Sequence, residues 1–120
     1  MWTYNQQNGQ LSHNGKLVAV GYSGFEANKN NPAAESIRNE GPIPRGLWEI
    51  GDMIESTVSH GPFVLPLIPC EGTDTFGRSG FLIHGESVHA PGSASFGCVI
   101  QPRWVRVQMG HSADKQLQVV

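Results

Sequence analysis

Residues 81–100 have the sequence FLIHGESVHAPGSASFGCVI, in which a short apolar strand and an apolar dipeptide flank a loop rich in Gly, Ser and Pro. Because side chains alternate between the two faces of a strand, His84 is expected on the opposite face from Phe81 and Ile83. The glycine that follows His84 ends the strand. His84 is therefore expected where a rigid strand meets a loop.

The rest of the chain is also divided into short segments. It contains 15 Gly and 8 Pro, and the pairs Asn8-Gly9 and Asn14-Gly15 favour tight hairpin turns because both residue types tolerate positive φ. Short strands separated by turns at this density indicate a mainly β fold, a small β-sandwich or open barrel. The expected strands are Trp2–Tyr4, Gly9–Leu11, Lys16–Gly21, Gly46–Ile50, Pro62–Cys70 and Ser79–His84.

Three segments carry more specific expectations. The continuous apolar run in Lys16–Gly21 is suited to burial on both faces. Pro66 argues that its strand lies at a sheet edge or contains a bulge, because proline cannot donate to a ladder. A short, peripheral helix is expected at about residues 32–39, because Asn31 can cap it, a proline fits its first position and a Gly-Pro pair ends it. One or two short helices are expected in all.

Length and charge narrow the classes of partner. A chain of 120 residues is expected to form one domain, residues 1–120. With a net charge of −2 and scattered basic residues, it has no cationic stripe for nucleic acid. The amino terminus lacks the pattern of a secretory signal, and no apolar run is long enough to cross a bilayer. We therefore expect a soluble protein without a visible signal peptide and without a membrane span.

Cys98 and His84 are the residues of this segment whose side chains could act as a nucleophile and a base. A free thiol with a pKa of about 8.5 is little ionised at neutral pH, so a nucleophilic cysteine needs an imidazole within hydrogen-bond reach. The flexible loop between the two residues can close that distance. Gly97 lets backbone approach a substrate, and the amides of Gly97 and Cys98 are candidates for an oxyanion hole.

Structural roles and metal binding are the alternatives for these residues. Judged alone, one His and one Cys on a loop are more often structural than catalytic. His84, His89 and Cys98 are competent zinc ligands, but their spacing matches no zinc motif and a fourth ligand is not evident, so no metal or other cofactor is expected. Cys70 is interpreted as structural; a disulfide between Cys70 and Cys98 would exclude a cysteine enzyme.

The loop also resembles a known signature. His84-Gly85 followed by Ser95-Phe96-Gly97-Cys98-Val99 is similar to L,D-transpeptidase catalytic domains of YkuD type, where His-Gly precedes Ser-His-Gly-Cys-Ile/Val. The resemblance implies a mostly β fold, a nucleophile at Cys98 and a base at His84. Two positions depart from the pattern: Phe96 replaces the second histidine, and Ile100 stands where many members have Arg or Asn.

A compact branch of that superfamily is more similar still, the L,D-transpeptidase-like toxins delivered by type VI secretion. The segments 21–24, 41–46 and 84–87 carry this resemblance, which spans about residues 16–101. It implies a substrate made of the tetrapeptide stem of peptidoglycan. Since Ile100 has no charge, Arg103, Arg78 or Arg45 is expected to hold the substrate's carboxylate, and the sequence does not choose among them.

The remaining candidate site residues lie near these motifs. Each has a structural alternative, because serines often satisfy turn backbone, a loop carboxylate is often only solvated, and a strand tyrosine often packs on the core. The catalytic candidates are Cys98, His84, Gly97 and Ser95, and the substrate-binding candidates are Tyr22, Ser23, Glu86, Ser93, Phe96 and Arg103.

The resemblance implies cysteine-dependent acyl transfer on peptidoglycan stems, cutting tetrapeptide to tripeptide or exchanging its last D-amino acid. An antibacterial effector acting in the target periplasm is expected, with a cognate immunity protein and a component of the secretion machine as partners. One alternative is a non-catalytic wall-binding or phage-structural β domain. Another is a papain-like peptidoglycan amidase, although such enzymes place the cysteine before the histidine.

Overall fold

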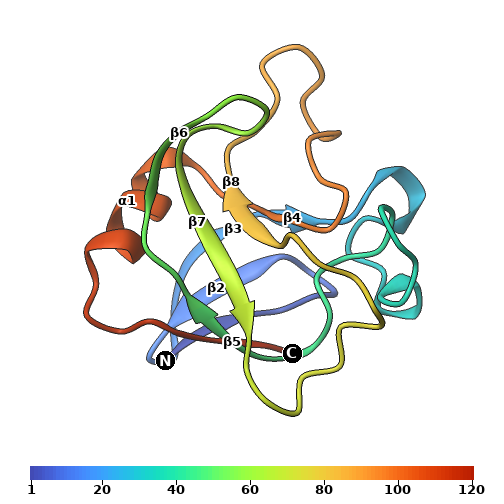
Figure 1. Cartoon of the computed structure of the whole chain (residues 1–120), viewed down its shortest axis with the longest axis horizontal. Coiled ribbons are helices and arrows are strands. Elements are labelled where there is room, and N and C mark those ends of the chain that lie inside the picture. Colours follow the sequence, from blue (N-terminus) through green and yellow to red (C-terminus); the bar gives the residue numbers. More distant parts are fainter.

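The chain folds into a continuous series of hydrogen-bonded strands with one α-helix against it (Figure 1). The structure is a computed structural model and describes all 120 residues. The strand order is β3-β2-β1-β10-β5-β7-β8-β9-β4, with β6 paired to β7. The predicted mainly β fold is confirmed. The strands are β1 (Trp2–Tyr4), β2 (Gln10–His13), β3 (Lys16–Val20), β4 (Tyr22–Ser23), β5 (Gly46–Ile50), β6 (Ile54–Thr57), β7 (Gly61–Pro69), β8 (Leu82–His84), β9 (Val99–Ile100) and β10 (Gln116–Val119).

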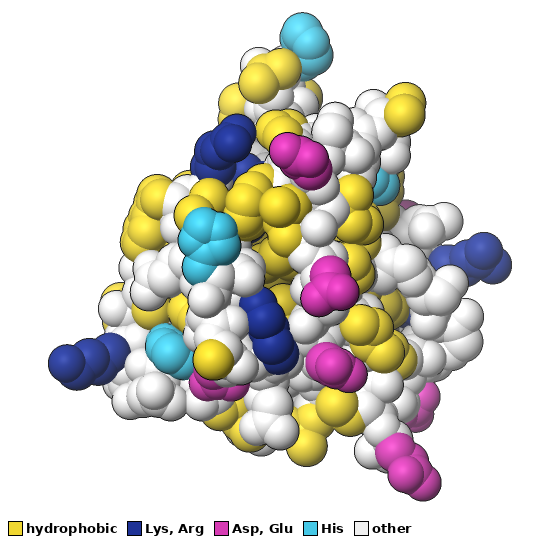
Figure 2. Space-filling model, turned by 60° about the vertical axis from the view of Figure 1, so that its left-hand side comes forward, with side chains coloured by type: hydrophobic (Ala, Val, Ile, Leu, Met, Phe, Trp, Pro, Cys, Tyr) yellow, Lys and Arg dark blue, Asp and Glu magenta, His cyan; other side chains and the backbone are white.

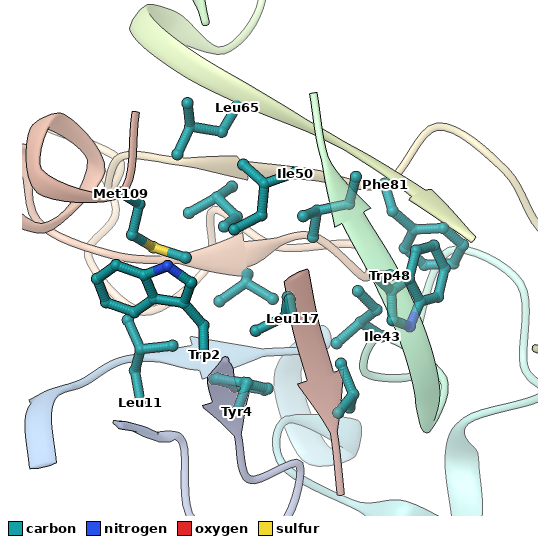
Figure 3. Close-up of a cluster of buried hydrophobic side chains, with 14 of the residues drawn as sticks. Trp2, Tyr4, Leu11, Ile43, Trp48, Ile50, Leu65, Phe81, Met109 and Leu117 are labelled. Carbon is teal, nitrogen blue, oxygen red and sulfur yellow. The ribbon is translucent and has the colours of Figure 1, made fainter. Parts of the chain in front are cut away.

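One hydrophobic core holds these strands together (Figure 3). Trp2 of β1 and Leu117 of β10 are fully buried in it, and they are register partners in the parallel pairing of these two strands. Trp48 of β5 packs edge-on against Phe81, with ring centroids 5.1 Å apart. Burying aromatic and aliphatic side chains of this size is the main stabilising contribution to such a fold.

The expectation that the run at β3 is buried on both faces is wrong. Leu17 and Val20 are each 60% exposed. The reason is topological, since β3 ends the strand order and pairs only with β2, while only Val18 and Ala19 pack against the core. The predicted turn at Asn14-Gly15 is present, with φ of 50° and 84°.

The expectation of an edge or a bulge at Pro66 is also wrong, because β7 lies between other strands and its registers with β5, β6 and β8 run without a shift. Its pairing with β6 ends at Val64 and its pairing with β5 begins at Leu67. Pro66 falls in the gap between these two partners, and its carbonyl oxygen accepts a hydrogen bond from the amide of Gly51 at 2.8 Å. The missing N–H of the proline therefore faces a position where no ladder bond is formed.

The helices differ from the prediction. Asn31 caps as expected, accepting from the amide of Ala33, but the helix is only a 3-10 turn at Pro32–Ala34; a second turn spans Glu26–Asn28. The α-helix α1 (Arg103–His111) was not predicted. It follows Pro102 without a side-chain cap, so the usual sequence signal for a helix start is missing. No helix has the length and apolarity needed to cross a membrane.

The two ends of the loop that joins His84 to Cys98 are held by adjacent strands. β8 ends at His84, and β9 begins directly after Cys98 and pairs with β8 in parallel, with His84 opposite Ile100. The long loop between β8 and β9 and the β6–β7 turn project from the same end of the molecule, away from both termini (Figure 1). This end carries the site described next.

Candidate active site

Cys98 and His84 line the same pocket, which has a volume of about 470 Å³. The strand pairing brings them there, since it places the residue before β9 beside the strand that ends in His84. The Cys98 sulfur lies 3.8 Å from the carbonyl oxygen of Gly80, within range of a weak S–H hydrogen bond. The two residues singled out by the sequence are thus brought to one pocket.

The His84 ring is oriented by its own loop. The residue is 4% exposed, and Nδ1 of its ring lies 2.9 Å from the carbonyl oxygen of Gly85. A carbonyl can only accept, so in the neutral ring Nδ1 carries the hydrogen and Nε2 keeps its lone pair. A backbone carbonyl therefore sets the tautomer that a general base requires.

The surroundings favour the uncharged forms of both residues. Burial lowers the pKa of His84, the hydrogen bond to Gly85 and the charge of Glu86 raise it, and the electrostatic effects of His60 and Arg106 lower it further. Burial raises the pKa of Cys98 to about 11, against the opposing effects of a backbone hydrogen bond from Leu82 and the charge of Arg78. A neutral thiol therefore shares the pocket with a neutral imidazole, the state from which a base can take a proton.

Gly97 is required by its surroundings. Its φ is +137°, and a Cβ at this position would lie 2.5 Å from Nη2 of Arg78. The buried guanidinium of Arg78 donates to the carbonyl oxygens of Glu35, Gly41 and Pro42. Arg78 therefore joins the segment around residue 41 to the cysteine loop.

Two buried serines hold the same loop. Ser95 Oγ accepts from the amides of Gly24 and Gly97 and donates to the carbonyl oxygen of Cys98. Ser23 Oγ donates to the carbonyl oxygen of Gly97 at 2.9 Å. Both side chains are fully buried and bond backbone, so their placement supports a structural role and gives no support to substrate contact by Ser23. The amide of Gly97 is engaged with Ser95, which leaves the amide of Cys98 as the candidate oxyanion donor.

Tyr22 fastens the loop at two points. Its hydroxyl donates to Glu86 Oε1 at 2.6 Å and accepts from the amide of Ala94 at 3.1 Å. Burial and the hydrogen bond to Glu86 raise the pKa of Tyr22 to about 12. Tyr22 lines neither main pocket, so its observed contacts support holding the loop in place and not forming the wall of the groove.

A second pocket of about 760 Å³ borders His84. It is lined by three of the predicted binding residues, Glu86, Ser93 and Phe96. The exposed ring of Phe96 also lines the first pocket and stacks on Phe25, with ring centroids 4.8 Å apart. The residues common to both pockets are His60, His84, Ala94 and Phe96.

Of the three arginines among which the sequence did not choose, one lines a main pocket and two do not. Arg103 is exposed at the start of α1 and lines neither pocket, and Arg45 is paired with Glu35. Arg78 does line the first pocket. Arg38 lines it too and was missed, because no motif or periodicity marks an exposed arginine in a loop.

The alternatives based on the cysteines and on metal can be compared with the structure. Both cysteines are free thiols, so the disulfide that would exclude a cysteine enzyme is not formed. No three His, Cys, Asp or Glu side chains are grouped so that they could hold a metal ion.

On the face shown in Figure 2, Lys and Arg side chains are separated by hydrophobic and acidic ones, with no continuous basic patch.

Comparisons with known proteins agree with the fold. The family model of the Tlde1 domain matches residues 18–119. The crystal structure of a cysteine-to-serine mutant of Enterococcus faecium L,D-transpeptidase has the same fold, with a TM-score of 0.60 at 15% identity. The match covers 99% of this chain and 48% of that one, so the chain spans about half the length of that protein. Among curated proteins no significant match was found.

Proposed function

Since the chain belongs to the Tlde1 domain family, whose members are L,D-transpeptidase-like type VI effectors, we propose that it catalyses cysteine-dependent acyl transfer on peptidoglycan stem peptides. The observation that carries the proposal is the placement of Cys98 and His84 in one pocket. The bond from His84 Nδ1 to the carbonyl of Gly85 supports it, because it leaves Nε2 free to accept a proton.

The acylation step uses these two side chains. Nε2 of His84 takes the proton of the Cys98 thiol, and the sulfur attacks the carbonyl carbon between the third and fourth residues of the stem. The amide of Cys98 is the candidate donor to the oxyanion that forms. When the C–N bond breaks, the imidazolium returns its proton to the departing amine of D-alanine, leaving a thioester on Cys98.

The deacylation step determines the product. Water attacking the thioester releases a tripeptide, which is carboxypeptidase action, whereas the amine of a D-amino acid gives an exchanged tetrapeptide. In either case the nucleophile gives its proton to His84, and the thiol of Cys98 is restored. The second pocket supports this step, because it gives a second approach to the same imidazole.

The proposal includes delivery and partners. Since members of this family are type VI effectors, we propose delivery into the periplasm of a target bacterium by a type VI secretion machine. A cognate immunity protein would protect the producer by covering the pocket mouth.

The test is incubation of the purified protein with muropeptides of defined stem length, followed by mass analysis. Tetrapeptide should lose one alanine, and the variants Cys98→Ala and His84→Ala should each abolish the reaction. Because the two residues act as a unit, the double variant should be no worse than either single one. Binding to sacculi without any product would instead indicate a non-catalytic wall-binding domain.

A further inference from the structure

His60 lies against the ring of His84. It is at the end of the turn that joins β6 to β7, and its ring centroid is 4.8 Å from that of His84, with the planes inclined by 56°. Its Nδ1 is 2.9 Å from Ser59 Oγ, and its backbone amide donates to Thr57 Oγ1. The turn thus places this imidazole against the proposed base.

The two imidazoles are the only polar side chains shared by both pockets, the other shared residues being Ala94 and Phe96. His60 therefore borders the same two openings as His84. A side chain in this position contacts the proposed base and is also open to both pockets.

The charged groups around His84 are few and of mixed sign. His60 faces it from the β6–β7 turn, Arg106 from α1 and Glu86 from the β8–β9 loop. Arg106 is fixed by hydrogen bonds to the carbonyl oxygens of Pro62 and Phe63 and is always charged. Unlike this fixed charge, the His60 imidazole can be either neutral or protonated.

We propose that His60 is a positioning residue of this site, which packs on the His84 ring and, when protonated, disfavours a second proton on His84 so that the base stays neutral in mildly acidic conditions. Two positive charges in contact repel each other, so the pair takes up its first proton more readily than its second. This repulsion agrees in direction with the electrostatic effect of His60, which lowers the pKa of His84. The inference rests on the proposed function, since it assigns His60 to the same site.

The direct test does not depend on activity. The ring signals of His84 are followed by NMR through a pH titration in the wild type and in His60→Phe, His60→Gln and His60→Lys. Phenylalanine keeps an aromatic ring but removes the charge, glutamine serves if the phenylalanine variant does not fold, and lysine keeps a positive charge throughout.

We expect the pKa of His84 to be higher in His60→Phe or His60→Gln than in the wild type, and equal or lower in His60→Lys. His111→Phe, at the end of α1 and outside both pockets, is the matched control and should not change it. Identical titrations of His84 in all the His60 variants would overturn the inference.

Activity then separates the inference from the proposed function. Against tetrapeptide, the acid limb of kcat/KM should move to higher pH in His60→Phe, giving several-fold lower activity than the wild type at about pH 5.5 and little difference at about pH 8. An unchanged pH profile in an active His60→Phe enzyme contradicts the role of His60 while the proposed function stands. A wild type that leaves every muropeptide uncut, together with the expected NMR shifts, contradicts the proposed function alone.

Discussion

The guanidinium of Arg78 lies directly behind Gly97, where a Cβ would come within 2.5 Å of Nη2. The glycine before the proposed nucleophile is thus required for two reasons, its φ of +137° and the buried side chain beside it. The cysteine loop can lie close to the segment around Gly41 only because position 97 has no side chain.

Gly97→Ala should therefore destabilise the protein and abolish activity. Backbone strain alone costs about 1–3 kcal/mol, and displacement of the Arg78 hydrogen bonds adds to it. Gly77→Ala is the matched control, because Gly77 has a φ of +72° but open space around a Cβ. It should cost about 1–2 kcal/mol and leave activity in place. Thermal unfolding and turnover of tetrapeptide measure both effects; equal losses in the two variants would contradict the steric argument.

Arg78→Gln should make Cys98 less acidic. Burial already raises the pKa of this thiol to about 11, and the positive charge of Arg78 is one of the influences that lower it. Without that charge, alkylation of Cys98 by iodoacetamide should require higher pH than in the wild type. The rate is measured against pH by mass spectrometry, with Cys70→Ala as the background so that only one thiol reacts. A faster reaction at neutral pH in Arg78→Gln would contradict the electrostatic role.

Tyr22 and Glu86 should be energetically coupled. Tyr22→Phe removes the hydrogen bonds to Glu86 and to the amide of Ala94, at a cost of about 0.5–1.5 kcal/mol each. Glu86→Gln weakens the first of these bonds and also the bond that the amide of Ser87 donates to Glu86 Oε1. In a double-mutant cycle of unfolding free energies, the combined loss should be smaller than the sum of the single losses. Additive losses would show that the contact does not hold the loop.

His84 should make the stability of the fold sensitive to mild acid. Burial lowers its pKa in the native state, so the unfolded chain binds the proton more readily. This contribution to stability is complete above the unfolded pKa of about 6.5 and is lost as the pH falls below it. Asp114, whose pKa is lowered to about 2, acts in a separate window below about pH 4. His84→Gln should thus flatten the loss of stability between about pH 7 and pH 5 in urea unfolding; an unchanged slope would contradict this.

Local patterns predicted the features that depend on local chemistry. The alternation in β5, the turn at Asn14-Gly15 and the cap at Asn31 follow from side-chain period, positive φ and a short polar side chain. The placement of Cys98 and His84 in one pocket could be predicted because a single loop joins the two residues and β8 pairs with β9.

Features that depend on distant contacts could not be predicted. Arg78 is held by hydrogen bonds that it donates to carbonyl oxygens of residues 35–42. His60 contacts His84 only because the β6–β7 turn reaches the same end of the molecule. The burial of β3 was overestimated because strand order, which no local pattern shows, leaves it at an edge. Helix α1 lacks a capping side chain, so its start had no local mark.

The most direct test of the central claim is the mass of the product formed from a single purified tetrapeptide muropeptide. With Cys98 as nucleophile and His84 as base, the wild type should release D-alanine and leave tripeptide. Added D-methionine should divert part of the acyl-enzyme into an exchanged tetrapeptide, and Cys98→Ala should form neither product. Pentapeptide should be a poor substrate. Cleavage of pentapeptide at its terminal D,D bond, cleavage between the glycan and the first alanine, or full activity in Cys98→Ala would contradict the cysteine mechanism.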